Sequence, residues 1–125
     1  MLNVLIVDDS AVTRAMILKT LRIADIDLGD TYEAANGQEG LDVLGRHWVD
    51  LLLVDINMPV MNGEEMIARV RENPAWSDLP IIVVSTEGSQ TRIEQLQNKG
   101  AHFIHKPFSP EVVRDIVQQV IGACR

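Results

Sequence analysis

The sequence contains a single cysteine, Cys124, and few aromatic residues, 4% of 125. One thiol cannot form an internal disulfide, and a zinc site needs several spaced Cys or His ligands, so Cys124 is interpreted as a free thiol near a fraying terminus. No apolar run approaches the roughly 18 residues that span a bilayer, and the start, MLNVLIVDDS, lacks the basic segment of a signal peptide. We therefore expect a soluble, cytoplasmic protein.

An excess of basic charge is also missing. The formal net charge is −7 and the isoelectric point is near 4.8. Such a charge opposes binding to the phosphate backbone of nucleic acids and to anionic membrane surfaces. We expect neither nucleic acid nor membrane among the partners.

The length fits one domain, residues 1–125, and the 46% hydrophobic content supplies one sizeable core. A further output module would need several tens of additional residues, and the chain stops right after its last amphipathic segment. We expect any signal to leave through the surface of this domain itself, and we expect a monomer.

Short apolar runs alternate with longer segments of helical period. Val4–Val7, Leu51–Val54 and Ile81–Val84 are nearly continuous runs of Leu and β-branched residues, typical of strands covered on both faces. Thr31–Ala34 and Ala101–His105 are more polar, which suits the edges of a sheet. Helical spacing recurs in two sets: Thr13, Met16, Ile17, Thr20, Leu21, Ala24; and Val112, Val113, Ile116, Val117, Val120, Ile121. The alternation predicts an α/β fold with five parallel strands, right-handed crossovers and helices on both faces.

Several helix ends are also legible. Asn36 precedes Glu39 at the spacing of a capping box, and Ser109 stands before Pro110 at a helix start. Asp9 or Ser10 could cap the first helix. Gly100 is placed to end the fourth helix, in which only Ile93 and Leu96 are large apolar anchors. We expect that helix to be held weakly, although the same pattern also describes an ordinary polar surface helix.

Polar residues stand where four of the strands end. The pair Asp8-Asp9 follows the first strand, Asp55 the third, Ser85 the fourth and Lys106 the fifth. The carboxyl ends of parallel strands line one crevice, so these groups are predicted to meet. Like charges at about 4 Å repel by roughly 4 kcal/mol at an effective dielectric near 20, so three acids beside one Lys are stable only with a cation present. A bound divalent metal is the simplest resolution.

The order and spacing of the strings VDDSAVTR, LLVDINMPVMNG, VVST and HKPF resemble the receiver domain of two-component response regulators, most closely the stand-alone CheY-like proteins. The resemblance covers essentially the whole chain. It implies a flavodoxin-like, doubly wound five-stranded sheet of order 2-1-3-4-5 with five helices. It also implies phosphorelay signalling, chemotaxis-type or other, in which a histidine kinase or phosphotransfer protein is the donor.

The resemblance assigns a role to each residue of the crevice. Asp55 would be the phosphoacceptor, a weak nucleophile helped by positioning and charge neutralisation. Asp9 would bind Mg²⁺ directly and Asp8 mainly through water, with Asp55 and the backbone carbonyl of Asn57 completing the protein ligands. Lys106 would pair with a phosphoryl oxygen, and in the resting state with Asp55. Without the resemblance, Asp55 reads as a turn residue and Asp8 and Asp9 as helix-capping acids.

Further roles implied by the resemblance concern switching and signal lifetime. Ser85 would donate its hydroxyl to the phosphoryl group, coupled to rotation of Phe103, and the surface of the fourth helix, fifth strand and fifth helix would bind a downstream protein. Asn57 and Glu87 would tune hydrolysis of the acyl phosphate. The resemblance implies no enzyme activity beyond self-phosphorylation and self-dephosphorylation. The Lys106–Pro107 peptide bond would be cis. An ordinary, partly exposed aromatic is the alternative interpretation of Phe103.

Two departures from the family pattern stand out. Thr86 replaces the small residue that commonly follows the hydroxyl residue, and the link before Phe103 is one residue shorter than usual. Two other functions share parts of this pattern but are disfavoured. A haloacid dehalogenase-type phosphatase needs a second Asp, as general acid, two residues after the nucleophile, and this chain has Asn57 there. A flavin mononucleotide-binding module would meet repulsion between the flavin phosphate and the Asp8-Asp9 pair.

Overall fold

The computed structural model describes residues 1–86, 89–106 and 108–123. Strands and helices alternate along the chain. They are β1 (Leu2–Val7), α1 (Ala11–Ile23), β2 (Leu28–Ala34), α2 (Gly37–Arg46), β3 (Leu51–Val54), α3 (Gly63–Glu72), β4 (Ile81–Ser85), α4 (Gln90–Asn98), β5 (Ala101–His105) and α5 (Pro110–Ala123). The described strands form one parallel sheet of order β2-β1-β3-β4-β5, as predicted.

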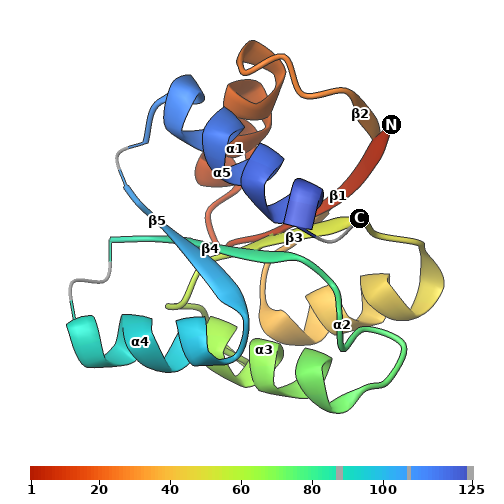
Figure 1. The fold of residues 1–125 in the computed structure, drawn as a ribbon. Coiled ribbons are helices and arrows are strands. Elements are labelled where there is room, and N and C mark those ends of the chain that lie inside the picture. Colours follow the sequence, from red (N-terminus) through yellow and green to blue (C-terminus); the bar gives the residue numbers. More distant parts are fainter. Residues whose placement is uncertain (87–88, 107, 124–125) are drawn as a thin grey trace.

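Two helical layers cover the sheet, α1 and α5 on one face and α2, α3 and α4 on the other (Figure 1). Each face has its own core. Ile17 and Leu21 of α1 pack with Val117 of α5 on one side, and Met66 of α3 and Leu96 of α4 lie in the cluster on the other. Strands β1, β3 and β4 supply both clusters through alternate residues, which explains their unbroken apolar sequences.

The helix starts follow their capping residues. Side-chain oxygens of Ser10, Asn36 and Ser109 accept backbone N–H bonds from Thr13, Glu39 and Val112. Ser10, rather than Asp9, therefore caps α1. In the Asn36 box the Glu39 carboxylate receives the Ala35 N–H and the Asn36 side-chain amide. Gly100 has φ +80° and its N–H bonds the Gln97 carbonyl, closing α4 as expected.

Strand β2 begins at Leu28, three residues before the predicted start at Thr31. Leu28 pairs with Leu2, and the register then shifts before Val4 pairs with Thr31. At this irregularity the Asn3 side-chain oxygen accepts the Asp30 N–H at 2.8 Å. A side chain thus replaces a ladder partner, which is why the polar segment Gly29-Asp30 does not read as a strand from its sequence.

Candidate functional site

The three acidic side chains predicted to meet do so at the carboxyl ends of β1 and β3. These strands are neighbours in the sheet, so Asp8 and Asp55 leave it side by side. One carboxylate oxygen from each of Asp8, Asp9 and Asp55 lies within 4.8 Å of the others. The predicted crevice is therefore an acidic cluster of Asp8, Asp9 and Asp55.

Asp8 is the most constrained of the three. It is 2% exposed, and its N–H bonds the Ala34 carbonyl of β2 at 3.0 Å. Its Oδ1 accepts the Ser10 N–H at 2.9 Å. Asp9 is exposed. One acid is thus fixed inside the turn while its neighbour faces solvent, where an incoming cation would arrive.

Lys106 reaches the cluster from the far edge of the sheet. Its N–H bonds the Ser85 carbonyl at 3.0 Å, continuing the β4–β5 ladder past the end of β5. Its Nζ lies 3.3 Å from Asp8 Oδ2 and 3.8 Å from Asp55 Oδ2. The pairing with Asp55 expected from the sequence is present, but the Lys106 ammonium is closer to Asp8.

Asp55 has an environment that opposes its charge. Burial raises the pKa of the Asp55 carboxyl above its ordinary value, and the Asp8 charge adds to this. The Lys106 ammonium and hydrogen bonds involving the Ile56 N–H and Ser85 side chain act in the opposite direction, but burial is the largest influence. A carboxylate that is costly to ionise gains most from a nearby cation.

The acidic cluster fits Mg²⁺ by its chemistry. Its donor atoms are carboxylate oxygens, the ligands that Mg²⁺ prefers, and one exposed member leaves room for the waters that this ion retains. Three acids facing one Lys also leave local negative charge that a divalent cation would balance. Asn57, the source of the predicted carbonyl ligand, lies two residues beyond Asp55 with an exposed side chain.

The loop that follows Asp55 is held tightly by its backbone. The Gly63 N–H bonds the Ile56 carbonyl at 2.9 Å, and a Cβ added at Gly63 would lie 2.2 Å from the Asp55 carbonyl oxygen. Val60 has φ +66°, and the Met61 N–H bonds the Pro59 carbonyl at 2.7 Å across it, the pattern of a strained γ-turn. Because Gly63 has no Cβ to collide with the Asp55 carbonyl, the start of α3 can approach Asp55 closely.

The predicted switch residues occupy neighbouring strands. Ser85 is 1% exposed at the end of β4, and Phe103 of β5 pairs with Val83 in the ladder. Phe103 is half-buried against the core on the α2–α4 face and forms an edge contact with His105, with ring centroids 4.7 Å apart. Thr86 is exposed next to Ser85. Glu87, Pro107 and Cys124 lie outside the residues that the structure describes. The predictions for Glu87, for the Lys106–Pro107 peptide bond and for Cys124 therefore stay predictions.

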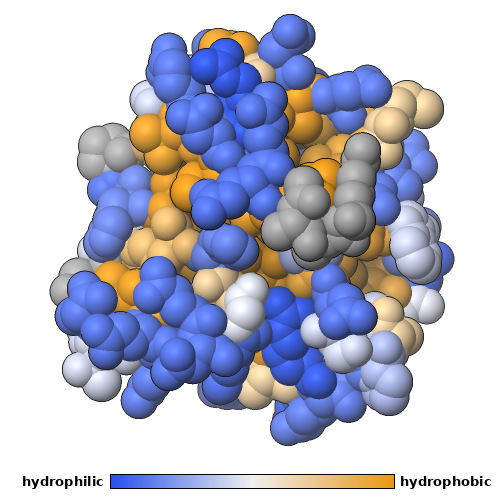
Figure 2. Space-filling model, viewed as in Figure 1, coloured by the Kyte–Doolittle hydropathy of each residue, from blue (hydrophilic) through white to orange (hydrophobic). Residues whose placement is uncertain are grey.

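Helix α4 has the sparse apolar anchoring expected from its sequence, because Ile93 and Leu96 are its buried residues. It also has polar links to α3 that the sequence does not reveal. At its first turn, Arg92 forms an ion pair with Glu64 of α3. At its other end, Arg71 Nε of α3 donates to the Lys99 carbonyl at 2.7 Å. Figure 2 shows mostly hydrophilic residues over α4, at the lower left.

Two residues that shape the site were not singled out from the sequence. Gly63 permits the close approach just described, and Arg14 Nη1 donates to the Asp8 carbonyl at 2.5 Å. The only signal for Arg14 is its place one turn into the helix that follows the acidic pair. For Gly63 it is a glycine at a helix start, where a cap alone would have explained it.

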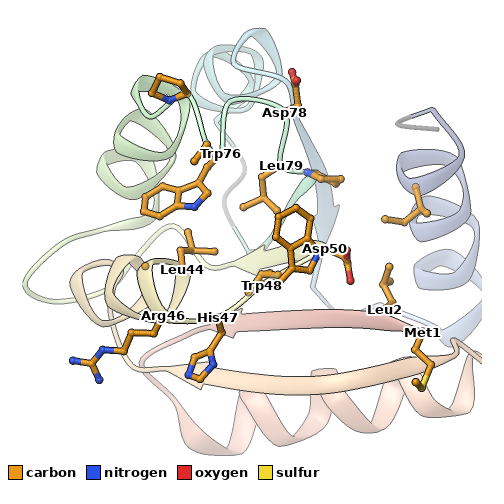
Figure 3. Close-up of a pocket in the computed structure, with 16 residues that line it drawn as sticks. Met1, Leu2, Leu44, Arg46, His47, Trp48, Asp50, Trp76, Asp78 and Leu79 are labelled. Atoms are coloured by element: carbon orange, nitrogen blue, oxygen red, sulfur yellow. Dashed lines mark hydrogen bonds between the residues drawn. The ribbon is translucent and has the colours of Figure 1, made fainter.

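A cavity of about 680 Å³ lies at the opposite, amino end of the sheet (Figure 3). Trp48, Trp76 and Leu79 line it together with Leu44 of α2. Its Asp50 carboxylate already accepts the Trp48 Nε1–H at 2.8 Å and the Asn3 N–H at 2.9 Å. None of the residues predicted for the site lines this cavity, so the hollow and the acidic cluster are separate features.

Comparison with known proteins identifies the family. The family model described as "Response regulator receiver domain" matches residues 4–118. The chain belongs to this family. The chemotaxis protein CheY homolog of Campylobacter jejuni is 37% identical to this receiver over 123 residues, covering 97% of this chain and 93% of that protein.

Two further relatives fit the same assignment. A solved structure of chemotaxis protein CheY4 of Vibrio cholerae superposes with a TM-score of 0.84 at 35% identity, covering 96% of this chain and 98% of that one. The sensor histidine kinase CheAY of Helicobacter pylori contains a segment, 15% of its length, that is 37% identical over 121 residues and covers 94% of this chain.

The protein is thus a CheY-type receiver of two-component signalling, as the sequence strings indicated, and its sheet order is that of the fold they implied. The haloacid dehalogenase-type alternative finds no support in these comparisons. Over the residues that the structure describes, no helix has the length and apolar character needed to cross a membrane.

Proposed function

We propose that this receiver takes a phosphoryl group on Asp55 from the phosphohistidine of a partner kinase, in a reaction that requires Mg²⁺. The observation that carries the proposal is the meeting of Asp8, Asp9 and Asp55 within 4.8 Å, with the Lys106 ammonium 3.8 Å from Asp55 Oδ2. An acid cluster alone could be a charged surface. Its placement at two neighbouring strand ends, β1 and β3, with a cation from a third, β5, supports a phosphoryl-transfer site.

The reaction is an in-line displacement at phosphorus. A carboxylate oxygen of Asp55 forms the new P–O bond while the bond from phosphorus to the donor imidazole nitrogen breaks and leaves its electron pair on that nitrogen. The product is an acyl phosphate on Asp55. Asp55 stays aligned because its N–H bonds the Val7 carbonyl at 2.9 Å and its Oδ1 accepts the Ile56 N–H at 2.8 Å.

Charge neutralisation would come from two sources. Lys106, already 3.3 Å from Asp8, would turn its ammonium toward a phosphoryl oxygen. Mg²⁺, when bound by Asp9, Asp55 and the Asn57 carbonyl, with Asp8 acting mainly through water, would supply positive charge to the transferred group. The chemistry is self-modification and self-hydrolysis rather than turnover of a metabolite, with Asn57 and Glu87 tuning the hydrolysis.

The signal would leave through the surface formed by α4, β5 and α5. Ser85 lies beside Asp55 and its hydroxyl would move to the phosphoryl group, while Phe103, half-buried on β5, would rotate inward. Phe103 has no hydroxyl to fix the inward rotamer. A downstream protein that binds one state better would shift the population by its differential affinity.

We extend the proposal to the protein's setting. The domain would comprise residues 1–125 and act as a cytoplasmic monomer. It would avoid nucleic acids and membranes, because its net charge of −7 opposes binding to anionic surfaces. The kinase partner is supported by the histidine kinase CheAY, which carries a segment similar to this chain.

Acetyl phosphate with Mg²⁺ tests the proposal without the unidentified kinase. Intact mass spectrometry should show one acid-labile, hydroxylamine-sensitive phosphoryl adduct, and peptide mapping should place it on Asp55. Asp78→Asn, which removes an exposed carboxylate at the cavity end of the sheet, is the matched control and should react normally. Normal adduct yield in Asp55→Asn, or in wild type with chelator, would refute the assignment.

A further inference from the structure

Arg14 turns its side chain toward the acidic end of the sheet instead of into solvent. Its Nη1 donates to the backbone carbonyl of Asp8 at 2.5 Å, and its Nε donates to Glu33 Oε1 at 2.9 Å. The Arg14 side chain is 16% exposed. A guanidinium held at two points, next to β1 and on β2, has little freedom to move.

The carbonyl that Arg14 holds belongs to the peptide bond joining Asp8 to Asp9. The orientation of this peptide plane sets the direction in which the chain continues into Asp9. The amide side of Asp8 is already fixed by the Ala34 carbonyl, and its Oδ1 by the Ser10 N–H. Arg14 therefore supplies the restraint on the side of Asp8 that leads to the exposed acid.

We propose that Arg14 is a positioning residue for the acidic cluster of Asp8, Asp9 and Asp55. By binding the Asp8 carbonyl it orients Asp9 so that the exposed carboxylate is presented to a divalent cation. Glu33 holds the guanidinium at the angle this requires. The inference rests on the proposed function and extends it to a residue outside the predicted ligand set.

Charge and positioning predict opposite results when Arg14 is neutralised. The positive charge of Arg14 repels an incoming cation, so a purely electrostatic role means that Arg14→Gln binds Mg²⁺ more tightly. A positioning role means that the same variant binds more weakly, because the ligands lose their preset geometry. The direction of the change therefore separates the two.

Isothermal titration of the metal-free protein with MgCl₂ measures that direction. We expect Arg14→Gln to weaken Mg²⁺ binding about tenfold, within the range seen when supporting residues of metal sites are removed. Arg14→Lys keeps the charge but loses the two-point geometry and should fall in between. Arg22→Gln removes an equal charge from an exposed position near the other end of α1 and should stay within about twofold of wild type.

Adduct formation from acetyl phosphate provides a second readout. The Mg²⁺ concentration for half-maximal rate should rise about tenfold in Arg14→Gln while the rate at saturating Mg²⁺ stays close to wild type. General loss of structure would instead lower the saturating rate. Urea unfolding in chelator measures that loss directly, and if Arg14→Gln does not fold, Arg14→Lys carries the test.

Unchanged or tighter Mg²⁺ binding in a folded Arg14→Gln variant would overturn the inference and leave the proposed function standing. Absence of Mg²⁺ binding by the wild type would overturn both. The result for wild type thus separates failure of the site from failure of the role given to Arg14.

Discussion

The two ends of the parallel sheet differ in shape and in charge balance. At the amino end a cavity of about 680 Å³ is lined by tryptophans, and both oxygens of its Asp50 carboxylate accept hydrogen bonds. At the carboxyl end three carboxylates cluster, two of them 3.3 Å and 3.8 Å from the Lys106 ammonium, and burial opposes the charge of Asp55. The Asp50 carboxylate thus has hydrogen-bond donors on both oxygens, whereas the acidic cluster gathers three carboxylates around a single ammonium group.

This difference supports placing the proposed chemistry at the carboxyl end of the sheet. A pocket needs only space, but group transfer needs charges arranged before the reacting group arrives. The environment of Asp55 has that character, because burial raises the pKa of its carboxyl. Concavity alone would have selected the end opposite to the acidic cluster.

The largest expected effect contrasts two lysines, one at each end of the sheet. Lys106→Gln should slow adduct formation from acetyl phosphate about 100-fold, because it removes positive charge preset for the phosphoryl oxygens. Lys99→Gln, an exposed lysine where α4 ends, should react at the wild-type rate. Time-resolved mass spectrometry measures both, and equal slowing in the two variants would erase the contrast.

The two arginine links of α4 are expected to be unequal. Arg71 donates to the Lys99 carbonyl at 2.7 Å and to the Leu79 carbonyl at 2.8 Å, so Arg71→Gln should cost about 2 kcal/mol of unfolding free energy. Arg92 makes a partly exposed ion pair with Glu64, so Arg92→Gln should cost about 0.5 kcal/mol. Urea unfolding compares them.

Hydrogen exchange should show which part of α4 each of the two arginines, Arg71 and Arg92, stabilises. Arg92→Gln should increase exchange mainly in its first turn, near the acidic cluster, whereas Arg71→Gln should affect the last turn. That result would mean that the first turn of α4 opens more easily than its last turn, which Arg71 holds through two short hydrogen bonds. Equal exchange along α4 in both variants would contradict this arrangement.

Neutralising an acid should change stability in opposite directions at the two ends. Without metal, Asp55→Asn should raise the unfolding free energy by about 1 kcal/mol, because it removes a partly buried charge that repels Asp8. Asp50→Asn should lower the unfolding free energy by about 1 kcal/mol, because the Trp48 indole N–H and the Asn3 backbone N–H lose a charged acceptor. Denaturant unfolding at neutral pH in chelator measures both.

The Asp55 effect should also depend on pH with a defined sign. The folded protein binds the Asp55 proton more tightly than the unfolded chain does, because its pKa is raised. The contribution of Asp55 to stability is therefore lost as the pH rises from the ordinary Asp value through the raised folded value, and is constant above it. The gain in Asp55→Asn should grow across that window; a gain that shrinks with pH would contradict the burial argument.

The smallest expected effect is on intrinsic fluorescence. The chain has two tryptophans, and both line the cavity at the amino end. Saturation with Mg²⁺ should leave their emission unchanged, because the proposed site for the ion lies at the opposite end of the sheet. Met58→Trp places a reporter in the loop after Asp55 and should respond to Mg²⁺. A wild-type response of the same size would show that the two ends are coupled.

Much of the fold could be predicted from local patterns. The buried strands are recognisable as apolar runs. Asn36 and Ser109 indicate helix starts, because a capping side chain bonds within the first turn of its own helix. The early start of β2 could not be predicted, because the Asn3 side chain that completes its ladder is 27 residues away from Asp30. Arg71 gave no signal either, since its partners are backbone carbonyls that any residue could provide.

The sequence by itself determined which residues end the strands, because strand periodicity is encoded locally. The acids, the hydroxyl and the ammonium then gather at one edge, because the carboxyl ends of parallel strands share it. Tertiary structure alone decided that Lys106 lies nearer Asp8 than Asp55, that Arg14 holds the Asp8 carbonyl, and that Gly63 admits α3 against Asp55. Such details rest on offsets as small as that between 3.3 Å and 3.8 Å, among groups that approach one another only in the folded chain. Packing of the whole sheet and both helical layers sets them, and no short stretch of sequence contains that information.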